Sequence, residues 1–239
     1  PEPSKGALRL FDTVLARSVS AAERLQKMGV SEDIILPSGP LLEDGSALPY
    51  NESDHVDLTS SIAGRPVWLA SRIQPDELAT VLSAHRQAMR MAHRLLMVLV
   101  PADPKDAAMF RERCAEDNWR VNEWADGVFP SETTQILLAE DATEMGLWHR
   151  IAPVSFLGSS LVAGYGGCNP YDAAALGSAV IYGPGVGSHL DAYSRLAKAG
   201  AVRIVRDADS LAQALIQLNA PDRVAAMAHA GWEVVSAGA

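Results

Sequence analysis

From Gly64 onward, short apolar runs alternate with longer segments that have the period of an amphipathic helix. Such runs are typical of strands buried on both faces, and their alternation with helices predicts successive βα units. The sequence therefore predicts an α/β fold, with a Rossmann-like parallel sheet and helices on both faces. The predicted strands are 67–70, 95–100, 135–138, 154–158, 179–183 and 201–205, and the predicted helices are 75–92, 104–116, 143–151, one opening at 169–170, one from 189 and two at the end.

Residues 1–50 do not continue this alternation. A strand-like segment at 11–16, a helix from Ser20 and an apolar run at 34–37 lead into a polar stretch at 38–60. That stretch contains glycine, proline, asparagine and aspartate with little periodicity, which is typical of a linker. We therefore expect a boundary near Tyr50, with residues 51–239 forming a domain of their own.

The composition and the net charge limit which binding partners and which cellular environment are expected. The chain has 239 residues, and 20 Lys and Arg against 29 Asp and Glu give a net charge of −9, which disfavours a broad electrostatic contact with nucleic acid or anionic lipid. Two cysteines, Cys114 and Cys168, favour a reducing compartment over a disulfide framework. The longest apolar run, 95–101, is far below the roughly 20 residues that span a bilayer. Because the chain starts at Pro1, we treat it as part of a longer protein.

The segment 158–177, GSSLVAGYGGCNPYDAAALG, carries the clearest functional signal. A strand leads into serines, then glycines, and then a helix that opens at Pro170. Glycines let the backbone approach a ligand, and a helix N-terminus offers N–H groups to a phosphate. Asp172 could accept a ribose hydroxyl or complement the helix dipole. A tight connection with a capped helix remains the alternative interpretation.

Three further features could contribute to a ligand site. Ser71 and Arg72 follow the first strand at the edge where open α/β sheets bind ligands, and Arg72 could hold a phosphate or carboxylate or be an ordinary surface residue. The glycine loop at 183–188 is either a short connection or a rim of the same cleft. Glu144 could accept hydrogen bonds from a ligand or cap its helix. Asp76 and Glu77 are expected in the first turn of the helix that opens at Pro75.

The histidines and Cys168 are not expected to be catalytic. His85 lies on an apolar helix face and is predicted to be a core residue, and His149 is predicted to lie on the polar face of its helix or to be half-buried. Cys168 stands beside a helix N-terminus, which would lower its pKa, but without a base we expect a packed or ligand-adjacent side chain. His93 has no metal-ligand partner at the right spacing, so no metal site is predicted.

At 158–177, together with EMGLWHR at 144–150 and GRPVWLA at 64–70, the chain resembles the C-terminal half of the 3-deoxy-D-manno-octulosonic acid (Kdo) transferases. The resemblance runs from about Leu10 to Val235. It implies the GT-B fold, two Rossmann-like domains facing across a cleft, with residues 1–50 as the tail of the N-terminal domain and the linker. It also implies transfer of Kdo from CMP-Kdo to lipid A precursor in lipopolysaccharide assembly, at the cytoplasmic face of the bacterial inner membrane, without metal or other cofactor.

By the resemblance, the CMP part of the donor binds to residues 51–239. The implied donor-binding residues are Glu144, Gly146, Leu147, Ser159, Ser160, Gly166, Gly167, Asn169, Pro170 and Asp172. Ser71 and Arg72 are expected to join them because they follow the first strand at the ligand-binding edge of the sheet. The family's general base lies near the start of its N-terminal domain, so no catalytic residue is expected in these 239 residues. We expect the chain alone to bind nucleotide weakly and to catalyse nothing, with acceptor and membrane contacts made by the N-terminal part.

Several positions differ from the family pattern. Arg72 and Ile73 replace Thr and His, Cys168 replaces His, Asp172 replaces Glu, and Ala102 replaces Arg in a Pro-Arg-His segment. Two alternatives therefore stay open. One is a non-catalytic homologue that serves as a nucleotide-binding or scaffold domain, and the other is a GT-B enzyme that uses a UDP-sugar.

Overall fold

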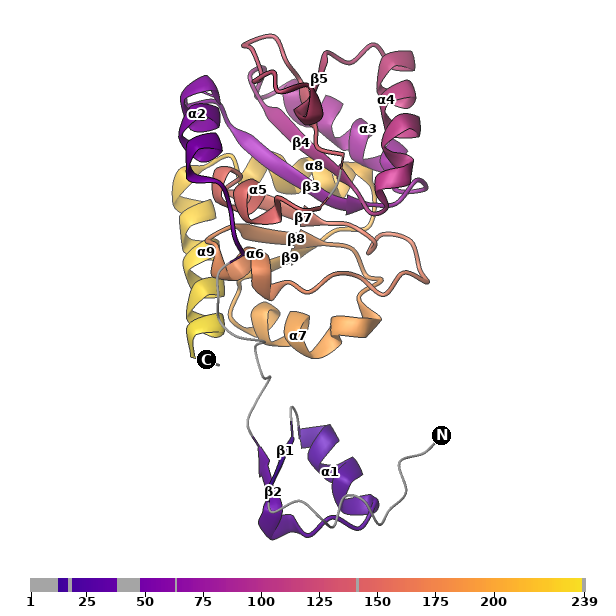
Figure 1. Cartoon of the computed structure of the whole chain (residues 1–239), viewed down its shortest axis with the longest axis vertical. Helices are drawn as coiled ribbons and strands as arrows, with labels where there is room; N and C mark the ends of the chain where they lie inside the picture. Colours follow the sequence, from indigo (N-terminus) through magenta and orange to yellow (C-terminus); the bar gives the residue numbers. More distant parts are fainter. Residues whose placement is uncertain (1–12, 17–18, 38–47, 63, 141, 238–239) are drawn as a thin grey trace. The chain divides into compact units, whose positions relative to one another are not determined.

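The computed structural model describes residues 13–16, 19–62 except 38–47, 64–140 and 142–237. Two compact units divide the chain, the first formed by 1–46 with 236–239 and the second by 47–235 (Figure 1). Each unit is described by itself. The boundary near Tyr50 stays a prediction.

The first unit contains a small parallel βαβ arrangement. Strand β1 (Val14–Ala16) pairs with β2 (Ile35–Pro37), and helix α1 (Val19–Lys27) connects them. Val30 and Ile35 are buried against partly buried neighbours from these elements. The strand, helix and apolar run expected here are thus confirmed for the described residues.

The second unit is built on a seven-stranded sheet in which every described pair of neighbouring strands is parallel. The strand order is β5-β6-β4-β3-β7-β8-β9. This confirms the predicted α/β fold with a Rossmann-like sheet. The strands are β3 (Val67–Ile73), β4 (Leu96–Pro101), β5 (Val121–Glu123), β6 (Ile136–Leu138), β7 (Val154–Leu157), β8 (Ala179–Tyr182) and β9 (Val202–Ile204).

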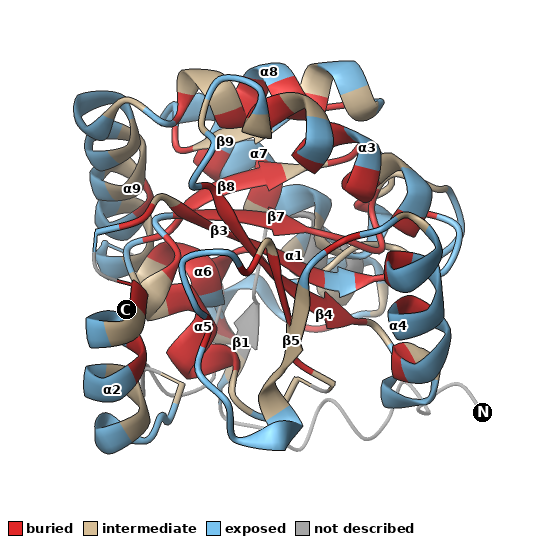
Figure 2. Ribbon diagram, turned by 90° about the horizontal axis from the view of Figure 1, so that it is seen from above, coloured by how far each residue is buried: buried red, intermediate tan, exposed pale blue. Residues whose placement is uncertain are grey.

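Helices cover both faces of this sheet, which explains the apolar runs (Figure 2). Successive residues of β4 face opposite sides: Met97 and Leu99 pack in one core cluster, and Val98 and Val100 in another. A strand buried on both faces needs apolar residues at every position. The first cluster includes residues of α3 (Leu78–Met89), α4 (Ala107–Glu116) and α8 (Ala208–Gln217). The second includes residues of α2 (Glu52–Ile62) and α5 (Met145–Ile151). Residues of α6 (Tyr171–Ala175) and α7 (Leu190–Lys198) pack in a third cluster, and α9 (Pro221–Ser236) follows α8.

Helix α2 corrects the linker prediction, which covered 38–60. Residues 38–47 lie outside the described part, but 52–62 form a helix whose start is capped by Asn51, since Asn51 Oδ1 accepts the N–H of Ser53 at 2.9 Å. Only Leu58 and Ile62 of this helix are buried. With only two buried apolar residues, α2 has too weak a hydrophobic period to be recognised as a helix from the sequence. The three-residue edge strand β5 was also missed.

Strand β3 lies at the point where the strand order reverses. It pairs with β4 on one side and with β7 on the other. In open α/β sheets, ligands bind outside the carboxyl ends of the strands that flank such a switch point. The fold therefore directs attention to the segments that follow β3 and β7.

Candidate functional site

The backbones that follow β3 and β7 approach each other closely. The N–H of Gly158 donates to the carbonyl oxygen of Ser71 at 2.8 Å. A Cβ atom on Gly158 would lie 2.7 Å from the carbonyl oxygen of Arg72 and 2.7 Å from Ile73 Cδ1. Only glycine fits this position, so the two segments form one surface at the switch point.

Glu77 is the centre of this surface, and its side chain is fully buried. One carboxylate oxygen accepts the N–H groups of Ser159 at 2.7 Å and Gln74 at 3.0 Å. The other accepts those of Ser160 and Leu161, both at 2.8 Å. Helix α3 begins at Leu78, so Glu77 lies before the helix rather than inside its first turn. Sequence reasoning missed this role, although a carboxylate directly after the first strand of a Rossmann-like sheet was the available signal.

This arrangement changes what the two serines can offer a ligand, because their N–H groups already donate to Glu77. Their hydroxyl groups are also bonded within the protein. Ser159 Oγ donates to the carbonyl oxygen of Arg72 at 2.9 Å, and Ser160 Oγ donates to that of Leu157 at 2.5 Å. Both serines therefore shape the segment after β7, and their contact with a donor stays a prediction.

The two glycine-rich loops pack against each other. The N–H of Ser188 donates to the carbonyl oxygen of Gly166 at 3.1 Å, and the N–H of Gly185 donates to that of Ser160 at 2.6 Å. Gly166 and Gly167 have φ of 85° and 78°, and a Cβ on Gly166 would collide with the Ser188 side chain. This contact favours the interpretation of 183–188 as a rim of the same site.

The helix after the glycines is short and capped from within the chain. Helix α6 begins at Tyr171, and Asn169 Oδ1 accepts the N–H of Tyr171 at 3.1 Å. Pro170 is buried just before the helix, while Asn169 is exposed. The capped-helix interpretation therefore describes this start, and the exposed face of Asn169 leaves its proposed ligand contact open.

Three charged or titratable side chains gather beside the loops: Arg72, Asp172 and His189. The Arg72 guanidinium is exposed, and among the described residues it makes no hydrogen bond or ion pair. Partial loss of hydration raises the pKa of Asp172, whereas Arg72 and His189 act to lower it. Loss of hydration lowers the pKa of His189, and Asp172 opposes that change. His189 was not among the predicted site residues, because only the fold brings it to Asp172.

The expectation for the pKa of Cys168 is wrong, whereas the expectation for its packing is confirmed. Burial raises the pKa of its thiol to about 11, so the lowering expected from a helix N-terminus is wrong. The thiol donates to the carbonyl oxygen of Gly158 at 3.4 Å. A thiol that stays protonated near neutral pH is no nucleophile, and Cys168 is a packed side chain as predicted.

Glu144 lies on the other side of the switch point, directly before α5. Its carboxylate accepts a short hydrogen bond from Trp124 Nε1. Gly146 and Leu147 are buried behind it, and a Cβ on Gly146 would collide with the carbonyl oxygens of residues 48 and 49. These two residues pack α5 against the start of the unit, so of the three residues predicted in this segment Glu144 is the one that is partly exposed.

His85 and His149 belong to the core. Trp68 Nε1 donates to His85 Nδ1 at 3.1 Å, and His149 Nδ1 lies 3.0 Å from Ser155 Oγ. Burial lowers the pKa of each histidine to about 4. The core prediction for His85 is confirmed, and His149 is more buried than expected.

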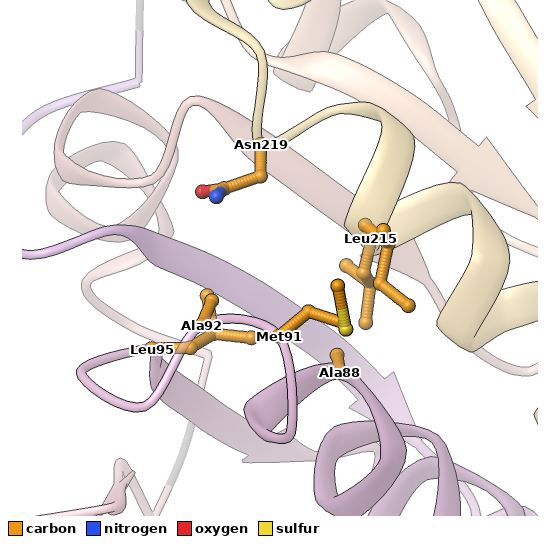
Figure 3. Close-up of a pocket in the computed structure, with 7 residues that line it drawn as sticks. Ala88, Met91, Ala92, Leu95, Leu215 and Asn219 are labelled. Carbon is orange, nitrogen blue, oxygen red and sulfur yellow. The ribbon is translucent and has the colours of Figure 1, made fainter.

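A small apolar pocket lies away from the candidate site (Figure 3). Ala88, Met91, Leu95 and Leu215 line it, with Asn219 as a polar neighbour. Leu95 precedes β4, so the pocket is at the amino ends of the strands. It offers no charged group to a nucleotide.

The described residues contain no group of three or more His, Cys, Asp or Glu side chains arranged to hold a metal ion. They also contain no helix both long enough and apolar enough to cross a bilayer.

Comparison with known proteins points to one group of enzymes, although no family model matches the chain. A curated 3-deoxy-D-manno-octulosonic acid transferase of Bordetella pertussis is 30% identical over 244 residues, covering 98% of this chain and 55% of the relative. One of Haemophilus influenzae is 27% identical over 173 residues, covering 72% of this chain and 40% of the relative. The chain thus spans about half the length of the curated relatives it matches.

A solved structure agrees with this. The C-terminal CMP-Kdo binding domain of WaaA from Acinetobacter baumannii superposes with a TM-score of 0.72 at 22% identity, covering 77% of this chain and 96% of that domain. The class is thereby defined by its fold: a Rossmann-like domain that matches the C-terminal domains of GT-B glycosyltransferases. Within that class, the sequence is similar to the Kdo transferases, and its resemblance to their C-terminal half is confirmed.

Proposed function

We propose that this chain is the donor-binding part of a Kdo transferase and that it binds the CMP portion of CMP-Kdo at the carboxyl ends of β3, β7 and β8. The observation that carries the proposal is the exposed guanidinium of Arg72, which has no hydrogen-bond or ion-pair partner within the described part of the chain and lies beside Asp172 and His189 at the switch point. The similarity to proteins named Kdo transferases supports the choice of donor.

Each group of the donor has a matching partner at this edge. CMP-Kdo carries a phosphate and a sugar carboxylate, which need a cation, and Arg72 supplies one with a planar set of donors. The ribose diol can donate to the carboxylate of Asp172. Asn169 and the glycine loops offer an amide and close backbone approach. Glu144, held by Trp124, is a candidate acceptor for the cytosine amino group.

Only part of the reaction is assigned to these residues. In an inverting transfer, a carboxylate base takes the proton of the acceptor hydroxyl while the donor site stabilises the departing phosphate. The second task is the one that Arg72 performs in this proposal. We assign the base, the lipid A acceptor and the contact with the cytoplasmic face of the inner membrane to the N-terminal half of the transferase, so the 239 residues alone bind donor without transferring sugar.

Calorimetric titration of the chain with CMP, UMP and UDP tests this proposal. We expect CMP to bind more tightly than UMP and UDP, and Arg72→Ala to weaken CMP binding at least about tenfold. Arg90→Ala is the matched control, because Arg90 is exposed on α3's far end. Absence of CMP binding contradicts the proposal, and preference for UDP supports a UDP-sugar enzyme instead.

A second candidate is a non-catalytic homologue. The observation in its favour is Cys168, whose thiol is packed on Gly158 where the family has a histidine. Kdo transfer from CMP-Kdo, assayed with a protein that contains these residues together with an N-terminal half, separates the two. Binding of CMP without transfer supports the non-catalytic homologue.

A further inference from the structure

We propose that Glu77 is a positioning residue that serves as a built-in anion: its carboxylate fills the N–H pocket at the switch point and holds the segment after β7 and Arg72 in the shape that receives the donor. The part about the donor rests on the proposed function. The part about the pocket rests on the geometry of Glu77 alone.

Four backbone hydrogen-bond donors face the carboxylate. The N–H groups of Gln74, Ser159, Ser160 and Leu161 lie 2.7–3.0 Å from its two oxygens. A cluster of backbone N–H groups after a strand of a Rossmann-like sheet is the usual place for a ligand phosphate. Three of the four donors belong to Ser159, Ser160 and Leu161, which are separated from Glu77 by 82, 83 and 84 positions in the sequence. The side chain therefore joins β3 to β7 in the manner of a bound anion.

The same network fixes two residues in an unfavourable backbone region. Arg72 and Ser159 have φ of 50° and 55°, which non-glycine residues rarely adopt. Ser159 donates its N–H to Glu77 and its hydroxyl to the carbonyl oxygen of Arg72, and Gln74 Nε2 donates to Ser159 Oγ at 2.9 Å. Such conformations persist only where surrounding bonds determine them. Glu77 thus acts on Arg72 through Ser159.

This arrangement determines where the anion of a donor can lie. A phosphate at the N–H groups of Ser159 and Ser160 would compete with the buried charge of Glu77 for the same donors. The phosphate or sugar carboxylate is therefore bound outside the pocket, by the side chain of Arg72. The serines contribute by holding the loop rather than by touching the phosphate.

Chemical rescue tests the pocket directly. Glu77→Ala removes the CH2–COO⁻ group and leaves a space that matches acetate. We expect the variant to melt about 4 to 8 °C below the parent in chloride, because several buried N–H groups lose their partner. Acetate, and not acetamide or chloride at equal ionic strength, should restore most of that loss. Val81→Ala, a buried apolar truncation in the same helix, is the control that acetate should not rescue.

CMP titration distinguishes a positioning role of Glu77 from a purely structural one, because a purely structural role would leave the CMP affinity of the folded protein unchanged. In chloride, Glu77→Ala should bind CMP at least about tenfold more weakly per folded molecule, and acetate should restore the affinity, whereas Val81→Ala should bind CMP as the parent does. No acetate-dependent gain in melting temperature, or undiminished CMP affinity in Glu77→Ala, overturns the inference. If the parent itself fails to bind CMP, the proposed function falls, while acetate rescue of melting still decides the role of Glu77.

Glu77→Gln covers the case in which the alanine variant does not fold. The amide keeps the shape and one acceptor oxygen, but its NH2 group faces two N–H donors. We expect a folded protein with a lower melting temperature than the parent and weaker CMP binding, neither of which acetate corrects because the space is filled. A Glu77→Gln protein identical to the parent in both measurements overturns the need for a carboxylate.

Discussion

A buried charged side chain lies near each end of strand β3, a cation before it and a carboxylate after it. The cation donates hydrogen bonds to backbone groups, whereas the carboxylate accepts them. Before the strand, Arg65 donates to three carbonyl oxygens: those of Arg94 at 2.9 Å, Ser131 at 2.7 Å and Thr134 at 2.6 Å. After the strand, Glu77 accepts four backbone N–H groups. Neither side chain forms an ion pair among the described residues. Backbone groups make the hydrogen bonds to both charges, and Glu132 adds a longer-range electrostatic attraction to Arg65.

The difference lies in what each charge holds together. Arg65 ties the connections that precede β4 and β6, at the amino edge of the sheet. Glu77 ties the segments that surround Arg72, at the carboxyl edge where ligands bind. A buried charge bonded by backbone groups therefore stabilises the fold at one end of the strand and positions the proposed donor site at the other.

The largest expected effect is on stability at the amino edge. Arg65→Ala should lower the free energy of unfolding by about 3 to 5 kcal/mol, because one buried and two partly buried hydrogen bonds from a charged donor to carbonyl groups are lost. Urea unfolding measures this. CMP affinity per folded molecule should stay unchanged, and Arg94→Ala, which keeps the carbonyl that Arg65 uses, should unfold like the parent. Loss of CMP affinity in Arg65→Ala would erase the distinction between the two ends.

The next largest effect comes from pH. Burial keeps His85 and His149 neutral in the folded state with pKa values of about 4, whereas the unfolded chain binds protons below about 6.5. Stability is therefore full above pH 6.5 and falls as the pH drops toward 4. At pH 5 each histidine should cost about 2 kcal/mol relative to pH 8.

Urea unfolding at pH 8 and pH 5 checks this. His149→Gln removes one of the two titrating groups, so the loss between pH 8 and pH 5 should be about 2 kcal/mol smaller than in the parent. The same loss in both proteins would mean that His149 is not held neutral. Because both histidines lie in the core, this test separates the stability of the fold from the chemistry of the carboxyl edge.

A smaller effect on binding is expected at Asp172. Asp172→Asn should weaken CMP binding by about 1 to 3 kcal/mol, since the ribose hydroxyls lose a charged acceptor. The melting temperature should hardly change, because the side chain is exposed. Asp191→Asn, another exposed acid of the early α7 turn, is the control. Equal CMP affinity in both variants and the parent would place the ribose elsewhere.

The smallest effect is expected across the switch point. Trp124→Phe removes the N–H donor to Glu144 but keeps an aromatic ring against Trp148. We expect about 1 kcal/mol less stability and a loss of CMP affinity below about threefold. A loss above tenfold would shift the centre of the donor site toward β5 and β6.

The sequence predicted the central sheet well because burial on both faces leaves an apolar run that is readable without neighbours, as in β4. It also indicated the segment 158–177 and Arg72, since glycines and strand ends have local signatures. Helix α2 was mistaken for a linker because only Leu58 and Ile62 are buried.

The roles of Glu77 and His189 could not be predicted from the sequence, for a different reason. Three of the four partners of Glu77 lie in the segment after β7, and Asp172, which faces His189, lies across a loop contact. A local pattern shows a carboxylate beside a helix start, but only the strand order reveals which N–H groups it meets. The raised pKa of Cys168 likewise depends on burial that its neighbours in sequence do not show.

The most direct measurement is a titration of ¹⁵N-labelled protein with CMP, followed by amide chemical shifts. We expect the shifts to concentrate at Arg72, at 159–172 and at 183–189, with the amides near Arg65 unaffected. Shifts confined to the amino edge or to the pocket between α3 and α8, or no shifts at saturating CMP, would contradict this expectation.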